Sequence, residues 1–110
     1  MHNRLGRVKF SGKSGAFYSF TAYPLETVFS HEFSGVYVVT QRKEGKSKSG
    51  FVHRRFATGQ SDHLCSPLAS DKQSFAAQGA NCICLHVEAN QAARLKIEQD
   101  LFREPHAAQA

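Results

Sequence analysis

The chain has 110 residues, of which 41% are hydrophobic and 21% are charged. This length and composition fit one globular domain. They exclude a membrane span, because no stretch approaches the roughly 18 consecutive apolar residues that a spanning helix needs. The basic N-terminus lacks the apolar segment of a secretory signal, and the odd number of cysteines, three, argues against a disulfide framework. The expected compartment is therefore the cytoplasm.

The formal net charge is +5, and the positive charge is concentrated between Gln41 and Arg55, which hold three lysines and three arginines against one glutamate. Such a cluster can follow nucleic-acid phosphates, and binding would then depend on salt. We expect five side chains to make these contacts: Lys43, Lys46, Lys48, Arg54 and Arg55. The alternative is a solvated loop whose lysines only keep the protein soluble.

The predicted elements begin with an aromatic-rich N-terminal segment over residues 1–34, in which Ala16–Tyr23 can form a short strand. Its aromatic residues are typical of a core or a lid. The β-branched run Gly35–Thr40 predicts a buried strand, and Phe51–Thr58 predicts a second. The Gly-, Ser- and Lys-rich segment between them, Lys43–Gly50, is typical of a hairpin loop.

A helix is expected over Ser61–Gln78, with Ser61 or Asp62 as its N-cap and Gly79 as its stop signal. Ala80–Val87 predicts a third strand. Asn90 is expected to cap a last helix that runs to about Arg103 and ends before Pro105. Together these elements predict an α+β domain with a small, mainly antiparallel, three-stranded sheet covered by helices.

Four segments occur in the order and spacing of the GIY-YIG nuclease superfamily. Gly35-Val36-Tyr37 resembles its first signature, and Ala57-Thr58-Gly59 occupies the place of the second. Gln60–Leu64 resembles the polar turn before the first helix of that family, and Ile97–Leu101 resembles the late helix that presents a metal-binding glutamate. The resemblance covers residues 35–105 and implies the GIY-YIG fold, with residues 1–34 as an extension.

The resemblance also implies a nuclease site, of which only part is present. Tyr37 and Glu98 match the family's first tyrosine and its glutamate, which would hold Mg²⁺. Ala57 replaces the second tyrosine, and Pro67 replaces the phosphate-binding arginine. We therefore expect a non-catalytic or feebly catalytic module that binds nucleic acid, with no cofactor, or weakly held Mg²⁺ if activity remains. The alternatives are a divergent metal-dependent endonuclease and a protein-interaction domain without anion preference.

Both matching residues have structural alternatives. Glu98 falls on the same helical arc as apolar residues and can pair with Arg94, four residues earlier. Tyr37 is a strand tyrosine, which is usually part of a core with its hydroxyl at the rim.

The cysteines and histidines also permit two interpretations. Cys82 and Cys84 share one face of a strand, but a single intervening residue is a poor zinc spacing, which favours simple packing under a helix. Cys65 lies near a helix start and is a weak candidate nucleophile. Three histidines lie on or beside elements that would converge and could bind zinc or copper, although scattered polar positions are the better interpretation: His53, His63 and His86.

Overall fold

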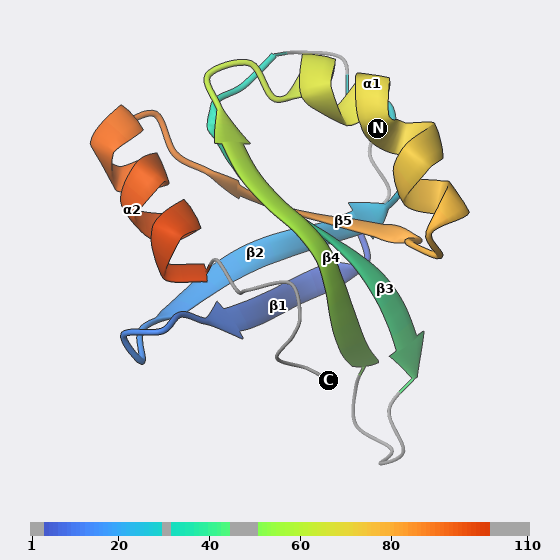
Figure 1. Ribbon diagram of the computed structural model, residues 1–110, viewed down its shortest axis with the longest axis horizontal. Coiled ribbons are helices and arrows are strands. Elements are labelled where there is room, and N and C mark those ends of the chain that lie inside the picture. The colour runs from blue at the N-terminus through green and yellow to red at the C-terminus, as the bar shows by residue number, and fades with distance from the viewer. Residues whose placement is uncertain (1–3, 30–31, 45–50, 102–110) are drawn as a thin grey trace.

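The computed structural model describes residues 4–29, 32–44 and 51–101. These residues form five strands and two helices (Figure 1). In chain order, the elements are β1 (Gly6–Ser11), β2 (Phe17–Pro24), β3 (Gly35–Glu44), β4 (Phe51–Ser61), α1 (Cys65–Ala77), β5 (Cys82–Val87) and α2 (Gln91–Leu101).

All five strands belong to one antiparallel sheet with the order β1-β2-β5-β3-β4. The predicted pairing of the two strands around the basic hairpin is confirmed, since β3 pairs with β4 from Gly35↔Ser61 to Glu44↔Phe51. The predicted three-stranded sheet covered by helices is wrong, because the described residues form a mostly β structure with five strands and two helices. Residues 1–34, expected to be an extension, supply β1 and β2, and β2 pairs with β5 in the middle of the sheet.

The sheet curls, so that β1 and β2 run steeply across β3 and β4 (Figure 1). The curl brings the two edge strands together on one side, where the rings of Phe10 in β1 and His53 in β4 meet edge to face with centroids 6.0 Å apart. We call this concave side the inner face. Its core contains Phe10, Phe20, Val36, Val38, Cys82 and Cys84, and α2 adds Ile97 and Leu101.

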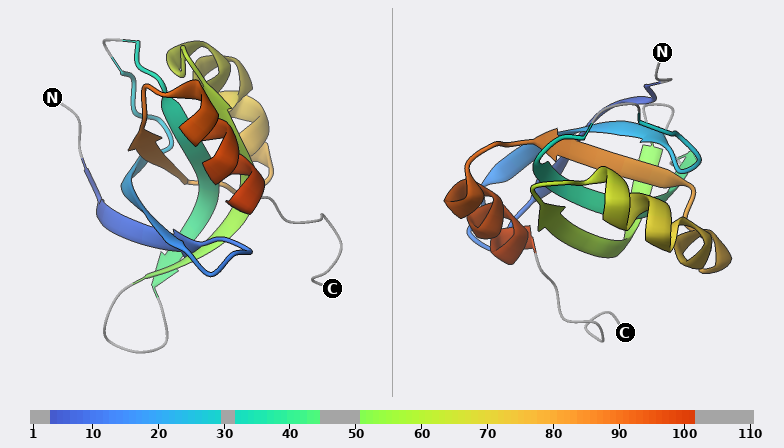
Figure 2. Two further views of the ribbon diagram at one scale, coloured as in Figure 1. Left: turned by 90° about the vertical axis from the view of Figure 1, so that its left-hand side faces the viewer. Right: turned by 90° about the horizontal axis from the view of Figure 1, so that it is seen from above.

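The opposite side, the outer face, is covered in part by α1. Leu64, Leu68 and Phe75 from the α1 region pack against a second set of strand residues: Val39, Ile83 and Leu85. Thus α2 packs on the inner-face core and α1 on the outer-face core, and the two helices lie on separate parts of the molecule (Figure 2). Within the described ranges, neither helix is both long and apolar enough to cross a membrane.

The helix ends show one correct prediction and one error. Asn90 caps α2, because its Oδ1 accepts a hydrogen bond from the backbone N–H of Ala93. Ser61 and Asp62 do not cap α1, since β4 extends to Ser61 and the N-cap position is Leu64, whose side chain makes no capping hydrogen bond. The carboxylate of Glu32 instead accepts a hydrogen bond from the N–H of Cys65.

Candidate metal centre

Three potential metal ligands converge on the inner face. Cys82 and Cys84 alternate with outward residues in β5, and both are fully buried. His53 comes from β4, which is separated from β5 by β3. The register explains the convergence, because Thr40 of β3 lies opposite Cys82, while the next inward position of β3, Arg42, lies opposite His53.

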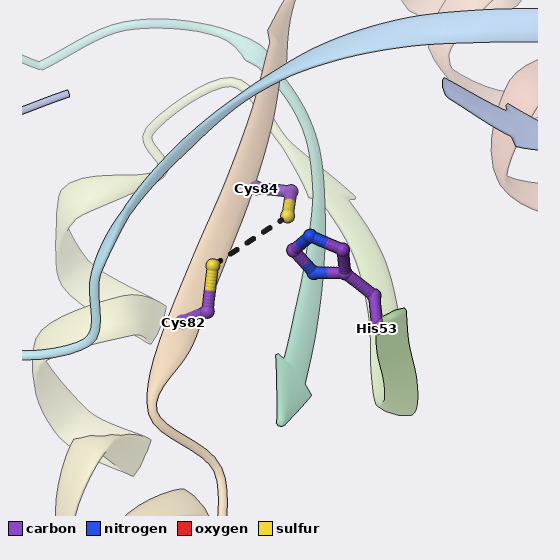
Figure 3. A group of neighbouring side chains, drawn as sticks. All are labelled: His53, Cys82 and Cys84. Carbon is purple, nitrogen blue, oxygen red and sulfur yellow. Dashed lines mark hydrogen bonds between the residues drawn. The ribbon is translucent and has the colours of Figure 1, made fainter. Parts of the chain in front are cut away.

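The ligand atoms of His53, Cys82 and Cys84 all lie within 4.8 Å of one another. The two Sγ atoms are 3.9 Å apart, and the imidazole lies beside both sulfurs (Figure 3). Two thiolates bound to one tetrahedral Zn²⁺ at about 2.3 Å would lie about 3.8 Å apart. The cysteine pair therefore already has the spacing that a zinc ion requires. Within the described part of the chain, no other group of three such side chains lies this close.

The pKa values of the two thiols are shifted in opposite directions. The hydrogen bond from Cys84 lowers the pKa of Cys82 to about 5, with smaller contributions from His53 and Thr40, against the opposing effect of burial. The same hydrogen bond, together with burial, raises the pKa of Cys84. The hydrogen bond therefore favours a pair that holds one thiolate, on Cys82, and one thiol, on Cys84. A thiolate is the form of cysteine that binds metals.

The groups around the cluster orient the histidine. Nδ1 of His53 lies 2.9 Å from the hydroxyl of Thr40, which is fully buried. This hydrogen bond leaves Nε2 as the nitrogen available to a metal, and a partner on the second ring nitrogen is typical of metal-binding histidines. Phe10 contacts the imidazole, and the guanidinium of Arg55 lies 5.4 Å from the centre of the Phe10 ring.

The predicted phosphate contacts have different environments. Lys43 and Arg54 have exposed side chains, and the guanidinium of Arg54 lies over the ring of Phe56. Arg55 is half-buried and donates a hydrogen bond to the carbonyl of Leu101 at the end of α2. Lys46 and Lys48 lie outside the described residues.

Tyr37 and Glu98, the expected remnants of a nuclease site, are not joined by a hydrogen bond, although the charge of Glu98 acts on the Tyr37 hydroxyl. Burial raises the pKa of the Tyr37 hydroxyl, with lesser contributions from the charges of Asp71 and Glu98. A raised pKa makes the phenolate harder to form, which disfavours Tyr37 as a base. Among the described residues, Glu98 belongs to no group of three closely spaced potential ligands.

Arg94 does not take the expected role of partner to Glu98. Its guanidinium is 2% exposed and forms an ion pair with Asp62. It also donates hydrogen bonds to the side chain of Gln60 and to the carbonyls of Glu88 and Ala89. Arg94 therefore fixes the start of α2 to the end of β4.

The other predicted candidates lie apart from the metal cluster. Nδ1 of His86 is 2.9 Å from the carbonyl of Ser19, and His63 is exposed. Burial, followed by the charge of Glu32, raises the pKa of Cys65, so this thiol is not an activated nucleophile.

The chain matches no protein-family model, no curated protein and no solved structure. The resemblance to the GIY-YIG superfamily therefore stays a prediction.

Proposed function

We propose that the protein is a zinc-binding domain in which one Zn²⁺ is held by His53, Cys82 and Cys84. The observation that carries the proposal is the convergence of these three ligand atoms within 4.8 Å, with the sulfurs 3.9 Å apart. The metal would link β4 to β5 across β3 and so stabilise the curl of the sheet. A site that forms only in the folded chain couples metal binding to stability.

Charge balance favours zinc over monovalent copper. Zn²⁺ with two thiolates and a neutral imidazole has no net charge, whereas Cu⁺ with the same ligands carries one negative charge. Both cysteines are fully buried, and an uncompensated charge at such a depth is costly. Zinc also accepts mixed sulfur and nitrogen ligands in a tetrahedral arrangement.

The site suits a structural or regulatory metal better than a catalytic one. Three protein ligands leave a fourth position, which is the pattern of catalytic zinc, but the buried hydroxyl of Thr40 lies beside the cluster. Phe10 covers the imidazole from β1. A substrate would have to displace this packing to reach the metal.

A competition titration with a chromophoric zinc chelator tests the proposal. The unmodified protein should bind one equivalent of zinc, and Cys84→Ser should lose most of the affinity. Cys65→Ser is the matched control, because Cys65 lies outside the cluster, and it should bind zinc as the unmodified protein does. Circular dichroism of each variant checks folding. Equal affinity in Cys84→Ser and Cys65→Ser would refute the site.

A second candidate function is nucleic-acid binding through the β3–β4 hairpin. The exposed side chains of Lys43 and Arg54 on this hairpin support it, as does the net charge of +5. Arg55 is a poor phosphate contact because it is half-buried, with its guanidinium over the Phe10 ring and bonded to the carbonyl of Leu101. Replacing Lys43 and Arg54 with Gln should weaken binding to all sequences. The slope of log affinity against log salt should flatten by about 1.4 for single strands. An unchanged slope in the double variant would contradict this function.

The proposed compartment is the cytoplasm. Cys65, Cys82 and Cys84 are all free thiols, a state that a reducing compartment maintains.

A further inference from the structure

A groove on the outer face lies on the side of the sheet opposite to the cysteine cluster. Its volume is about 470 Å³, within the range of roughly 300–1,000 Å³ that is usual for small-molecule sites. The floor comes from outward residues of two paired strands, Thr21 of β2 and Leu85 of β5. Tyr23 of β2, together with Phe29 and Phe33 from the chain that follows it, forms one wall of the groove.

The wall is aromatic. Tyr23 and Phe29 meet edge to face with centroids 5.1 Å apart, and Phe29 meets Phe33 in the same manner at 5.6 Å. All three line the groove and are half-buried. Because neighbouring rings are nearly perpendicular, they present both ring faces and ring edges, and both arrangements are favourable for packing against a flat aromatic group.

The other end of the groove is cationic. Nε and Nη2 of Arg7 donate to the hydroxyl of Ser19 at 3.2 and 2.9 Å. These bonds hold the guanidinium at the groove and use two of its five N–H donors. Its planar fork suits the geometry of a phosphate. Lys9, which is exposed, lies directly opposite Ser19 in the strand register and adds a second positive charge nearby.

We propose that this groove binds a nucleotide, with the base against Tyr23, Phe29 and Phe33 and the phosphate at Arg7. A flat ring joined to a phosphate matches an aromatic wall joined to a guanidinium. The nucleotide is either free or one unit of a single strand. Phe17, on the outward side of β2 beyond Ser19, is 70% exposed and offers a surface for a neighbouring base. The proposal extends the second candidate function and does not depend on the zinc site.

Calorimetric titration of the full chain tests the groove with three probes: adenosine monophosphate, adenosine and a short single-stranded oligoadenylate. Adenosine monophosphate should bind more tightly than adenosine, because only the nucleotide meets Arg7. Arg7→Gln should reduce affinity for the nucleotide roughly tenfold and leave adenosine unaffected. Lys96→Gln removes an equal charge from α2 and should change neither value.

A second variant tests the aromatic wall. Phe33→Leu should reduce the affinities for adenosine and for adenosine monophosphate by a similar factor, roughly tenfold, since both ligands carry the base. Absence of binding by all three probes would overturn the proposal, as would equal nucleotide affinity in Arg7→Gln and Lys96→Gln. Tighter binding of the oligoadenylate, lost in Phe17→Ala, would identify a single strand as the ligand. Equal affinity for the oligoadenylate and the monophosphate would identify a free nucleotide as the ligand. The groove would then no longer support a role in nucleic-acid binding.

Discussion

The proton count of the cysteine pair predicts how zinc affinity changes with pH. Cys84 keeps its proton at neutral pH, because its hydrogen bond to Cys82 and its burial raise its pKa. The same hydrogen bond lowers the pKa of Cys82, which favours its thiolate form. Zinc must therefore displace one proton, that of Cys84. Raising the pH by one unit lowers tenfold the proton concentration against which zinc competes, so affinity should rise about tenfold between about pH 7 and pH 8, or about 1.4 kcal/mol.

Competition titrations with a chelator of known pH dependence give this slope directly. Calorimetry in two buffers with different ionisation enthalpies counts the same proton independently. Cys65→Ser should keep the slope of one proton per zinc, because Cys65 lies outside the cluster. A slope near zero would mean that both thiols are already ionised, and a slope near two would mean that neither is. Either result would refute the sharing of one proton between Cys82 and Cys84.

Three further perturbations follow from the same structure. Arg94→Met removes four hydrogen-bonded contacts of a buried guanidinium and should lower the free energy of unfolding in urea by about 3 kcal/mol. Lys96→Met on the exposed side of α2 should change it by less than about 0.5 kcal/mol, and similar losses in both variants would contradict the role of Arg94. Gly59→Ala should lower the free energy of unfolding by about 1–3 kcal/mol, because an added Cβ would lie 2.6 Å from the Tyr37 hydroxyl. An unchanged free energy in the same urea assay would contradict this packing. A zinc concentration 100-fold above the dissociation constant should raise the free energy of unfolding by about 2.7 kcal/mol and the melting temperature by roughly 10–20 °C. A calorimetric scan without a shift would exclude a metal-stabilised fold.

Local patterns predicted much of the fold from β3 onward. The β-branched run of β3 and the cap at Asn90 depend on near neighbours in the chain, and both predictions are confirmed. The loop predicted over Lys43–Gly50 begins later than expected, because β3 extends to Glu44, and its remaining residues lie outside the described ranges. The first strand was missed. Gly6–Ser11 alternates polar and apolar residues, which is typical of an edge strand with one buried face, but the run is short and begins with a glycine.

The candidate site is formed by contacts between residues far apart in the chain, which local sequence patterns do not predict. Strand periodicity predicted that Cys82 and Cys84 share a face, and this is confirmed. The approach of His53 requires β5 to pair with β3, so that a residue about 30 positions earlier in the chain faces the same core. Strand order in a sheet is set by packing across the whole chain, so the spacing of the cysteines alone favoured simple burial.

The central claim is that His53, Cys82 and Cys84 bind one metal ion together. Cobalt(II) reports on it most directly, because it replaces zinc in tetrahedral sites and absorbs strongly when thiolates bind it. Titration of the reduced protein should give a thiolate-to-cobalt charge-transfer band that saturates at one equivalent and disappears when zinc is added. The band should persist in Cys65→Ser, weaken in His53→Ala and vanish in Cys82→Ser. Absence of the band in the unmodified protein, or its persistence in Cys82→Ser, would contradict the account.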